Sequence, residues 1–132
     1  GFGMVARPFP VPALGQLETV YDQGDVKIQA LLVDHGPVKP SVGYLFSYKE
    51  RTVLVSGDTA KSANLQQFAQ GVDLLVHDAL APNLVGVMHD TATKVGATGL
   101  AKITLDIQNY HASPVEAAEG ARDANVGHLW TG

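Results

Sequence analysis

The sequence predicts one α/β domain in which a mixed β-sheet packs against helices. Two observations support this fold class: strand-like segments open the chain as hairpins, and strands then alternate with helices in its second half. A length of 132 residues suits a single domain, 1–132, with a core of its own. Prolines at positions 8, 10 and 12 exclude a central strand or helix interior, so we expect an extended Pro/Gly-rich lead-in over residues 1–16.

The first half of the chain has the pattern of antiparallel hairpins. Apolar residues occupy every second position from Val26 to Leu32, with Lys27 and Gln29 between them. One face of this strand is therefore expected to be exposed to solvent at its start. A turn at 22–25 joins it to the preceding strand. The strands expected in this half cover residues 17–21, 26–33, 42–48 and 53–56.

The second half alternates strand and helix. A helix over 64–70, closed by Gly71, separates the 53–56 strand from a strand over 73–77, so these two strands should be parallel. Residues 82–95 suit a helix, whereas residues 96–112 fit either a helix around 100–107 or a mobile loop. Ser113 as N-cap and Glu116 form a capping box that starts a helix running to about Ala124, before a final strand over 126–131.

Composition limits the chemistry. The chain has no cysteine, so a metal ion would need His and carboxylate ligands. A net charge of −4 and the absence of a Lys/Arg-rich run make nucleic acid a disfavoured partner. No run of about 18 apolar residues is present, and no membrane partner is expected.

The opening residues Gly1 to Met4 do not suit a natural N-terminus and fit a cut inside a larger protein. No signal peptide is visible, which slightly favours a cytoplasmic location.

Asp58 is the first candidate site residue. It follows the buried 53–56 strand through Gly57, and α/β proteins place ligands at such strand ends. The alternative is that Asp58 caps a turn before the next helix.

His111 is the strongest histidine candidate. It lies two residues before the N-cap Ser113, where the helix dipole favours the neutral imidazole that suits a general acid or base. The alternative is a hydrophobic staple formed by Tyr110 with His111 at the helix start.

Other polar residues follow predicted strands. His77 and Asp78 end the 73–77 strand, where the carboxylate could orient a neighbouring imidazole, and His35 follows the 26–33 strand. His89 is expected to be solvated within its helix, and His128 to lie on the sheet surface or at the core edge.

Five segments together resemble one protein family. They are Val33-Asp34-His35-Gly36, Gly43-Tyr44, Ser56-Gly57-Asp58-Thr59, Leu74-Leu75-Val76-His77-Asp78-Ala79 and Tyr110-His111-Ala112-Ser113-Pro114-Val115-Glu116-Ala117-Ala118. In this order they resemble the metallo-β-lactamase-fold hydrolases, specifically the ribonuclease Z and arylsulfatase-like branch, over residues 25–132. The resemblance implies the C-terminal half of a four-layer sandwich, with a mixed sheet and helices on one face.

The resemblance also implies roles for individual residues. Asp58 would bridge two metal ions, usually zinc, and His111 would donate a proton to the substrate. Asp78 stands where the family usually has Glu, and we assign it with His111 to catalysis. We assign contacts with substrate, or support of the site, to His35, His77, Thr59 and Ser113.

Two departures from the family pattern limit this expectation. The His-x-His-x-Asp-His metal motif and the histidine after the final strand are both missing from the sequence. With Asp58 as its one assigned ligand, the chain is expected to bind zinc weakly or not at all and to be inactive alone, because zinc needs three or four protein ligands.

The expected function of the intact parent is zinc-dependent hydrolysis of a small ester-like substrate through a metal-activated water. The candidate substrates are a phosphodiester, a sulfate ester, a lactone and a β-lactam. The alternatives are a tRNA 3′-processing endonuclease and a non-catalytic assembly module. Such a module would cover its apolar sheet face with a second copy or with the missing N-terminal half.

Overall fold

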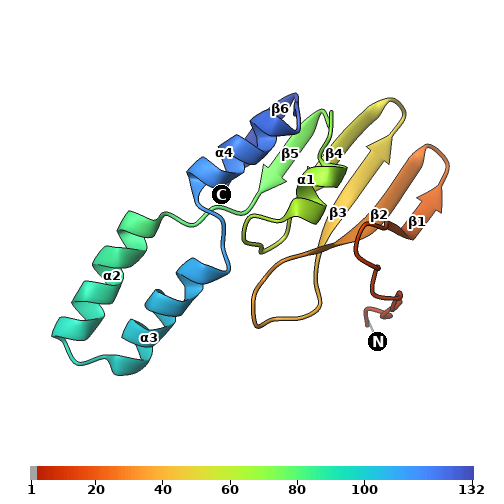
Figure 1. Ribbon diagram of the computed structural model, residues 1–132. Helices are drawn as coiled ribbons and strands as arrows, with labels where there is room; N and C mark the ends of the chain where they lie inside the picture. The colour runs from red at the N-terminus through yellow and green to blue at the C-terminus, as the bar shows by residue number, and fades with distance from the viewer. Residues whose placement is uncertain (1–2) are drawn as a thin grey trace.

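The computed structural model describes residues 3–132, which form a six-stranded mixed sheet with four α-helices (Figure 1). The strands lie in chain order, antiparallel from β1 to β4 and parallel from β4 to β6. The strands are β1 (Glu18–Gln23), β2 (Val26–Val33), β3 (Ser41–Tyr48), β4 (Arg51–Val55), β5 (Leu74–His77) and β6 (His128–Thr131). The helices are α1 (Ala63–Phe68), α2 (Pro82–Lys94), α3 (Thr98–Asp106), the 3-10 turn η1 (Ile107–Asn109) and α4 (Pro114–Asp123).

These elements confirm the predicted α/β fold class. β4 and β5 are parallel because α1 connects them, as the spacing predicts. The ambiguous segment 96–112 contains helix α3, so the helical alternative is the correct one. Residues 3–17 contain no helix or strand, and residues 1 and 2 of the expected lead-in lie outside the described part of the chain.

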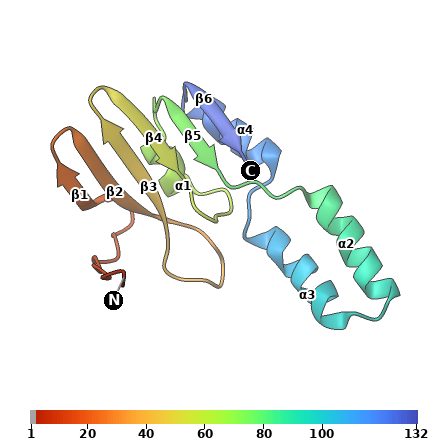
Figure 2. The same cartoon turned by 180° about the vertical axis from the view of Figure 1, so that it is seen from behind.

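The core lies between one face of the sheet and helices α1 and α4, which cover that face (Figures 1 and 2). Leu31, Leu54 and Leu75 project from three strands and are fully or almost fully buried. Ala121 of α4 and Ala124, which caps the end of this helix, pack in the same cluster, and their small side chains let the helix approach closely. The burial of these apolar side chains is the main contribution to the stability of the sheet with α1 and α4.

The opposite face of the sheet is apolar and carries no helix among residues 3–132 (Figure 2). Strand register places four side chains in one row across this face, one from each of the strands β2 to β5. They are, in strand order, Ile28, Phe46, Val53 and Leu74. Phe46 is 36% exposed, and Trp130 on β6 is 68% exposed. This large open surface agrees with the expected half of a sandwich, whose second sheet would cover it.

Helices α2 and α3 cover neither face of the sheet. They form a hairpin that extends beyond its end in both views, so the expectation of helices on one face holds for α1 and α4 alone (Figures 1 and 2). His89 is not simply solvated: its Nδ1 lies 2.8 Å from the carbonyl oxygen of Ala101 and joins the two helices. Within residues 3–132, no helix has the length and apolar character needed to cross a bilayer.

Candidate metal centre

The candidate site lies at one edge of the sheet, where three strands running in the same direction end. β2 is followed by His35, β4 by Asp58 and β5 by Asp78. Because β2, β4 and β5 share one direction, the loops after them meet at the same edge. Gly57 allows the sharp turn after β4, since its φ of +64° suits glycine and strains other residues.

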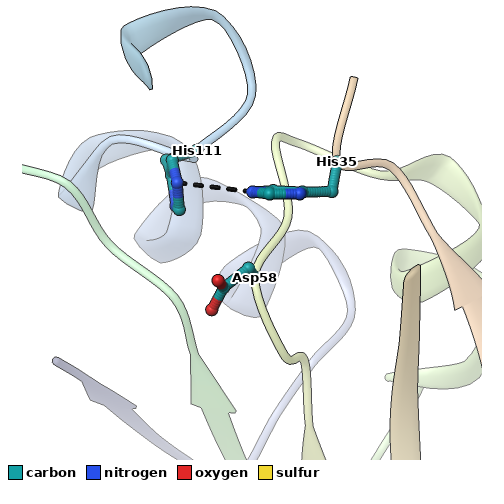
Figure 3. A group of neighbouring side chains, drawn as sticks. All are labelled: His35, Asp58 and His111. Carbon is teal, nitrogen blue, oxygen red and sulfur yellow. Dashed lines mark hydrogen bonds between the residues drawn. The ribbon is translucent and has the colours of Figure 1, made fainter. Parts of the chain in front are cut away.

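His35, Asp58 and His111 converge at this edge from three separate segments (Figure 3). One ligand atom of each lies within 4.8 Å of the others, and the two Nε2 atoms of His35 and His111 are 3.4 Å apart. Asp58 is exposed, whereas both imidazoles are half-buried. The group therefore presents two nitrogen donors and one carboxylate to a shared space that remains open to solvent.

Asp78 holds His111 from the other side of its ring. The Nδ1 atom of His111 lies 2.6 Å from Oδ2 of Asp78, and both side chains are less than one-fifth exposed. Asp78 is itself fixed, since its backbone N–H donates to Ser56 Oγ and its Oδ2 accepts from the backbone N–H of Thr59. A carboxylate on Nδ1 fixes the ring orientation and directs Nε2 towards His35 and Asp58.

Thr59 joins the loops that carry the candidate residues. Its side chain is fully buried, and its hydroxyl accepts from the N–H of Asp34, beside His35, and lies 3.0 Å from the carbonyl oxygen of the same residue. The carbonyl of Thr59 accepts from the N–H of Ala112, beside His111. Thr59 thus links the His35 loop, the His111 segment and Asp78. Because Asp58 directly precedes it in the chain, Thr59 also fixes the position of that residue.

Tyr110 fixes the other imidazole by packing. Its ring meets the His35 ring edge-on, with centroids 5.0 Å apart and an interplanar angle of 80°. Gly36 permits this approach, because a Cβ added there would lie 3.0 Å from Cβ of Tyr110. His35 has no carboxylate hydrogen-bonded to its ring among the described residues, in contrast to His111.

A hollow of about 330 Å³ lies beside Asp58 and Asp78. It is lined further by Trp130 at the open sheet face and by strand-end residues of β4 and β5. A cavity of this size is at the lower end of the range that accepts small ligands, about 300–1,000 Å³. The carboxylates therefore face a space in which a reacting group could bind.

Two solved structures share the fold of this chain. Human tRNase Z, short form, superposes with a TM-score of 0.63 and 19% sequence identity, covering 92% of this chain and 40% of that one. The metallo-β-lactamase fold protein YhfI from Bacillus subtilis gives a TM-score of 0.61 at 18% identity, covering 90% of this chain and 40% of the other. At these identities the comparison establishes the fold alone.

Sequence comparison with curated proteins is more specific. Ribonuclease Z of Mycolicibacterium paratuberculosis is 33% identical over 110 residues, 83% of this chain. Ribonuclease Z of Mycobacterium sp. (strain KMS) is 31% identical over 126 residues, 95% of this chain. The chain is a ribonuclease Z-like protein of the metallo-β-lactamase fold. It spans only 35% to 40% of the length of these two relatives. No protein-family profile matches the sequence.

These relatives confirm the predicted resemblance to the C-terminal half of ribonuclease Z-like proteins. An arylsulfatase-like character is not shown and stays a prediction. The expectation that nucleic acid is disfavoured as a partner is not supported, because the relatives are ribonucleases by name. That expectation depended on net charge, which describes the whole chain and not the surface around a site.

Two predicted site residues of this ribonuclease Z-like chain lie outside the cluster. Ser113 caps α4 as predicted, since its Oγ accepts from the Glu116 N–H and Glu116 accepts from the Ser113 N–H. The Glu116 carboxylate accepts from both the N–H and the hydroxyl of Ser113, and these two bonds lower the pKa of Glu116 below its ordinary value, against a smaller opposing effect of burial. His77 is buried, and its Nδ1 lies 2.7 Å from the carbonyl oxygen of Asp78. Both residues stabilise segments next to the site.

The donor set of the cluster fits a metal ion such as zinc, for which imidazole nitrogen and carboxylate oxygen are regular ligands. The Nε2 atoms of His35 and His111 are 3.4 Å apart, so an ion held by His35 and Asp58 would lie next to the His111 ring. Sequence reasoning assigned only Asp58 as a ligand and missed the proximity of both imidazoles. The sequence did contain a signal for His35 as a ligand: like Asp58, it follows closely after the end of a predicted strand.

Proposed function

We propose that this chain carries part of the catalytic centre of a metal-dependent hydrolase. The observation that supports this function is the convergence of His35, Asp58 and His111 within 4.8 Å of one another. Oxygen and nitrogen donors that converge from separate loops are characteristic of a metal site, and His111 among them is oriented by a carboxylate. The hydrolase fold of the relatives agrees with this proposal.

Within this site we assign metal binding to His35 and Asp58. The ring of His35 is held edge-on against the rings of Tyr110 and His111, and its Nε2 atom faces the shared space. His111 instead has its Nδ1 bonded to the carboxylate of Asp78, which fixes the ring with Nε2 towards the shared space. We therefore assign proton transfer to His111 and the orientation of its ring to Asp78, while Thr59 keeps the contributing loops together.

The chemistry follows from these positions. A bound zinc ion would supply Lewis acidity and lower the pKa of a coordinated water. His111 holds a proton at Nε2 when its ring is charged, and this atom faces the shared space beside Asp58. From there it can deliver the proton to a departing oxygen of the substrate. Asp78 stays bonded to Nδ1 during this transfer and therefore keeps the ring in the same orientation before and after the proton leaves.

The substrate class that suits this site is an ester-type bond. A phosphodiester is favoured within this class by the names of the relatives, ribonuclease Z and tRNase Z, and cleavage at RNA 3′ ends is therefore the second candidate. Sulfate esters, lactones and β-lactams stay in the broader proposal. The open sheet face also supports assembly with a second sheet layer, which would supply the ligands that the chain lacks.

Metal titration tests the ligand assignment without requiring activity. Zinc calorimetry and the d–d absorption of bound cobalt(II) should both detect one weakly bound ion per chain, because the chain supplies only part of a zinc ligand set. His35→Ala and Asp58→Ala should each raise the zinc Kd by at least about tenfold. The matched control is His128→Ala, because His128 is exposed on β6 and is absent from the donor cluster.

His111→Ala separates the two roles open to this residue. As a proton donor it should leave the zinc Kd within about threefold, a change below 1.4 kcal/mol. A loss of affinity equal to that of His35→Ala, with a changed cobalt spectrum, would make His111 a ligand instead. A zinc affinity that none of the three substitutions alters would contradict the metal site itself.

A further inference from the structure

A cavity of about 770 Å³ lies between the lead-in, the end of β2 and the start of α1, and we call it the lead-in cavity. Residues of the segments 11–14, 32–41 and 61–64 line it. Its volume is within the range of small-molecule sites, about 300–1,000 Å³. The lead-in lies beside β1 and β2 in both views of the chain (Figures 1 and 2). The lining includes neither the cluster His35, Asp58 and His111 nor any residue of the hollow beside Asp58, so the cavity is separate from the candidate metal centre.

Asn64 holds the three walls of the lead-in cavity together. Its Oδ1 atom accepts from the N–H of Gly15 in the lead-in at 2.9 Å, and its Nδ2 atom donates to the carbonyl of Leu32 on β2 at 2.8 Å. Asn64 itself lies in α1 and is only 8% exposed. Because a buried amide keeps its hydrogen-bond partners, this one side chain fixes the lead-in and β2 relative to the helix. The shape of the cavity is therefore set by the fold.

The apolar part of the lining is aliphatic. It consists of Val11, Leu14, Leu32, Val33, Pro40 and Ala63, and within residues 3–132 no aromatic ring and no arginine lines the cavity. A nucleobase binds proteins chiefly by stacking on aromatic or guanidinium planes, which this lining lacks. An aliphatic chain needs only apolar walls, because its binding is driven by the removal of apolar surface from water. The walls therefore suit an aliphatic chain better than a base.

The neutral polar side chains of the lining already make hydrogen bonds within the protein. Ser41 Oγ donates to the carbonyl of Asp58, and Ser62 Oγ accepts from the N–H of Leu65 as the N-cap of α1. The amide of Asn64 is used at both of its ends. Since a ligand is oriented by the few polar groups that its pocket presents, the polar end of a ligand must be recognised here by charged side chains.

The charged side chains of the lining are Asp34, Lys39 and Lys61. Lys39 takes part in none of the ion pairs found within residues 3–132. Lys61 has a 3.4 Å contact with Glu119, but both side chains are almost half exposed, and such pairs contribute little. Oδ1 of Asp34 accepts from the N–H of Gly36. Two ammonium groups thus face one carboxylate, and the net positive charge of the lining attracts an anionic group.

We propose that the lead-in cavity binds an aliphatic chain that ends in an anionic group, either a carboxylate or a phosphate monoester. The chain lies against the aliphatic walls, and Lys39 and Lys61 hold the anionic end. Both lysines belong to loops that follow β2 and β4, at the edge of the sheet that also carries the candidate metal centre. The proposal does not depend on the proposed hydrolase function, because no residue assigned to metal binding or proton transfer lines the cavity.

Isothermal titration of the metal-free 132-residue chain with octanoate tests this proposal. Lys39→Gln and Lys61→Gln should each raise the Kd of octanoate by about three- to tenfold, and Leu14→Ala by about threefold. All three side chains are exposed, so these variants should stay folded. Lys102→Gln on α3 is the matched control, and Phe46→Ala tests the open sheet face; both should leave the Kd unchanged. Undetectable binding by the wild type, lysine variants that bind like the wild type, or a loss confined to Phe46→Ala would overturn the proposal.

Ligands that share the chain but differ at its polar end test the requirement for an anion. Octanoate or octyl phosphate should bind the wild type at least about tenfold more tightly than octanol, and the tighter of the two identifies the preferred anionic group. This difference should shrink when Lys39→Gln and Lys61→Gln are combined. Octanol that binds as tightly as both anions would contradict the role of the lysines. Adenosine monophosphate should not displace octanoate, since the lining has no stacking plane, and displacement at comparable concentrations would indicate a nucleotide site instead.

Discussion

The Nδ1 atom of His111 lies 2.6 Å from Oδ2 of Asp78, although the two residues are 33 positions apart in the chain. This bond predicts that the proton of the neutral imidazole resides on Nδ1, because the carboxylate is an acceptor. Long-range ¹H–¹⁵N NMR should therefore show the Nδ1–H tautomer for His111. Asp78→Ala should shift its ring nitrogens and leave those of His128 unchanged. Identical His111 signals in both proteins would contradict this role of Asp78.

Thr59 should contribute to stability mainly through its hydroxyl. Thr59→Val keeps the shape but removes the acceptor for the Asp34 N–H, and an unpaired buried donor costs about 1–3 kcal/mol. Thr59→Ser keeps the hydroxyl and should lose only about 0.5–1.5 kcal/mol, comparable to removal of one buried methyl group. Urea unfolding gives both free energies. A serine variant less stable than the valine variant would show that packing of the methyl group is the larger contribution.

Gly43 allows β3 to pass close to the end of β4. A Cβ at this position would lie 2.9 Å from the carbonyl oxygens of Val55 and Ser56. Gly43→Ala should therefore destabilise the fold by about 1–3 kcal/mol and displace the segment that leads to Asp58. Gly99→Ala is the control, because a Cβ there meets nothing within 4 Å. In helix α3 that change should stabilise by about 0.5–1 kcal/mol. Equal effects on thermal unfolding would exclude the proposed close approach.

The capping box of α4 should make stability depend on pH in the acidic range. Hydrogen bonds to Ser113 lower the pKa of Glu116 in the folded state from its ordinary value of 4.5. The stabilisation is therefore fully present above that ordinary value and is lost as pH falls through the lower folded pKa. Glu116→Gln cannot titrate, so its free energy of unfolding should fall less steeply below pH 4.5 than that of the wild type. Parallel profiles for the two proteins would argue against this linkage.

Local signals in the sequence were sufficient for most of the fold. Alternating apolar positions located β2, and the segment after Asp58 revealed the parallel pair β4 and β5 through its intervening helix. The capping box located the start of α4, because its signature depends on residues that are near in sequence. Residues 96–112 stayed ambiguous because no side-chain cap marks the start of α3, and the stability of this short helix depends on packing against α2.

The sequence by itself determined the order of the elements and the family resemblance, and it singled out Asp58 and His111 as candidate site residues. Only the tertiary structure decided that His35 lies beside these two residues, that Asp78 bonds to His111 and that Thr59 connects the loops around them. It also decided that α2 and α3 extend beyond the end of the sheet as a hairpin. The physical reason is that secondary structure and caps depend on near neighbours, whereas a site depends on which strand ends the sheet register brings together.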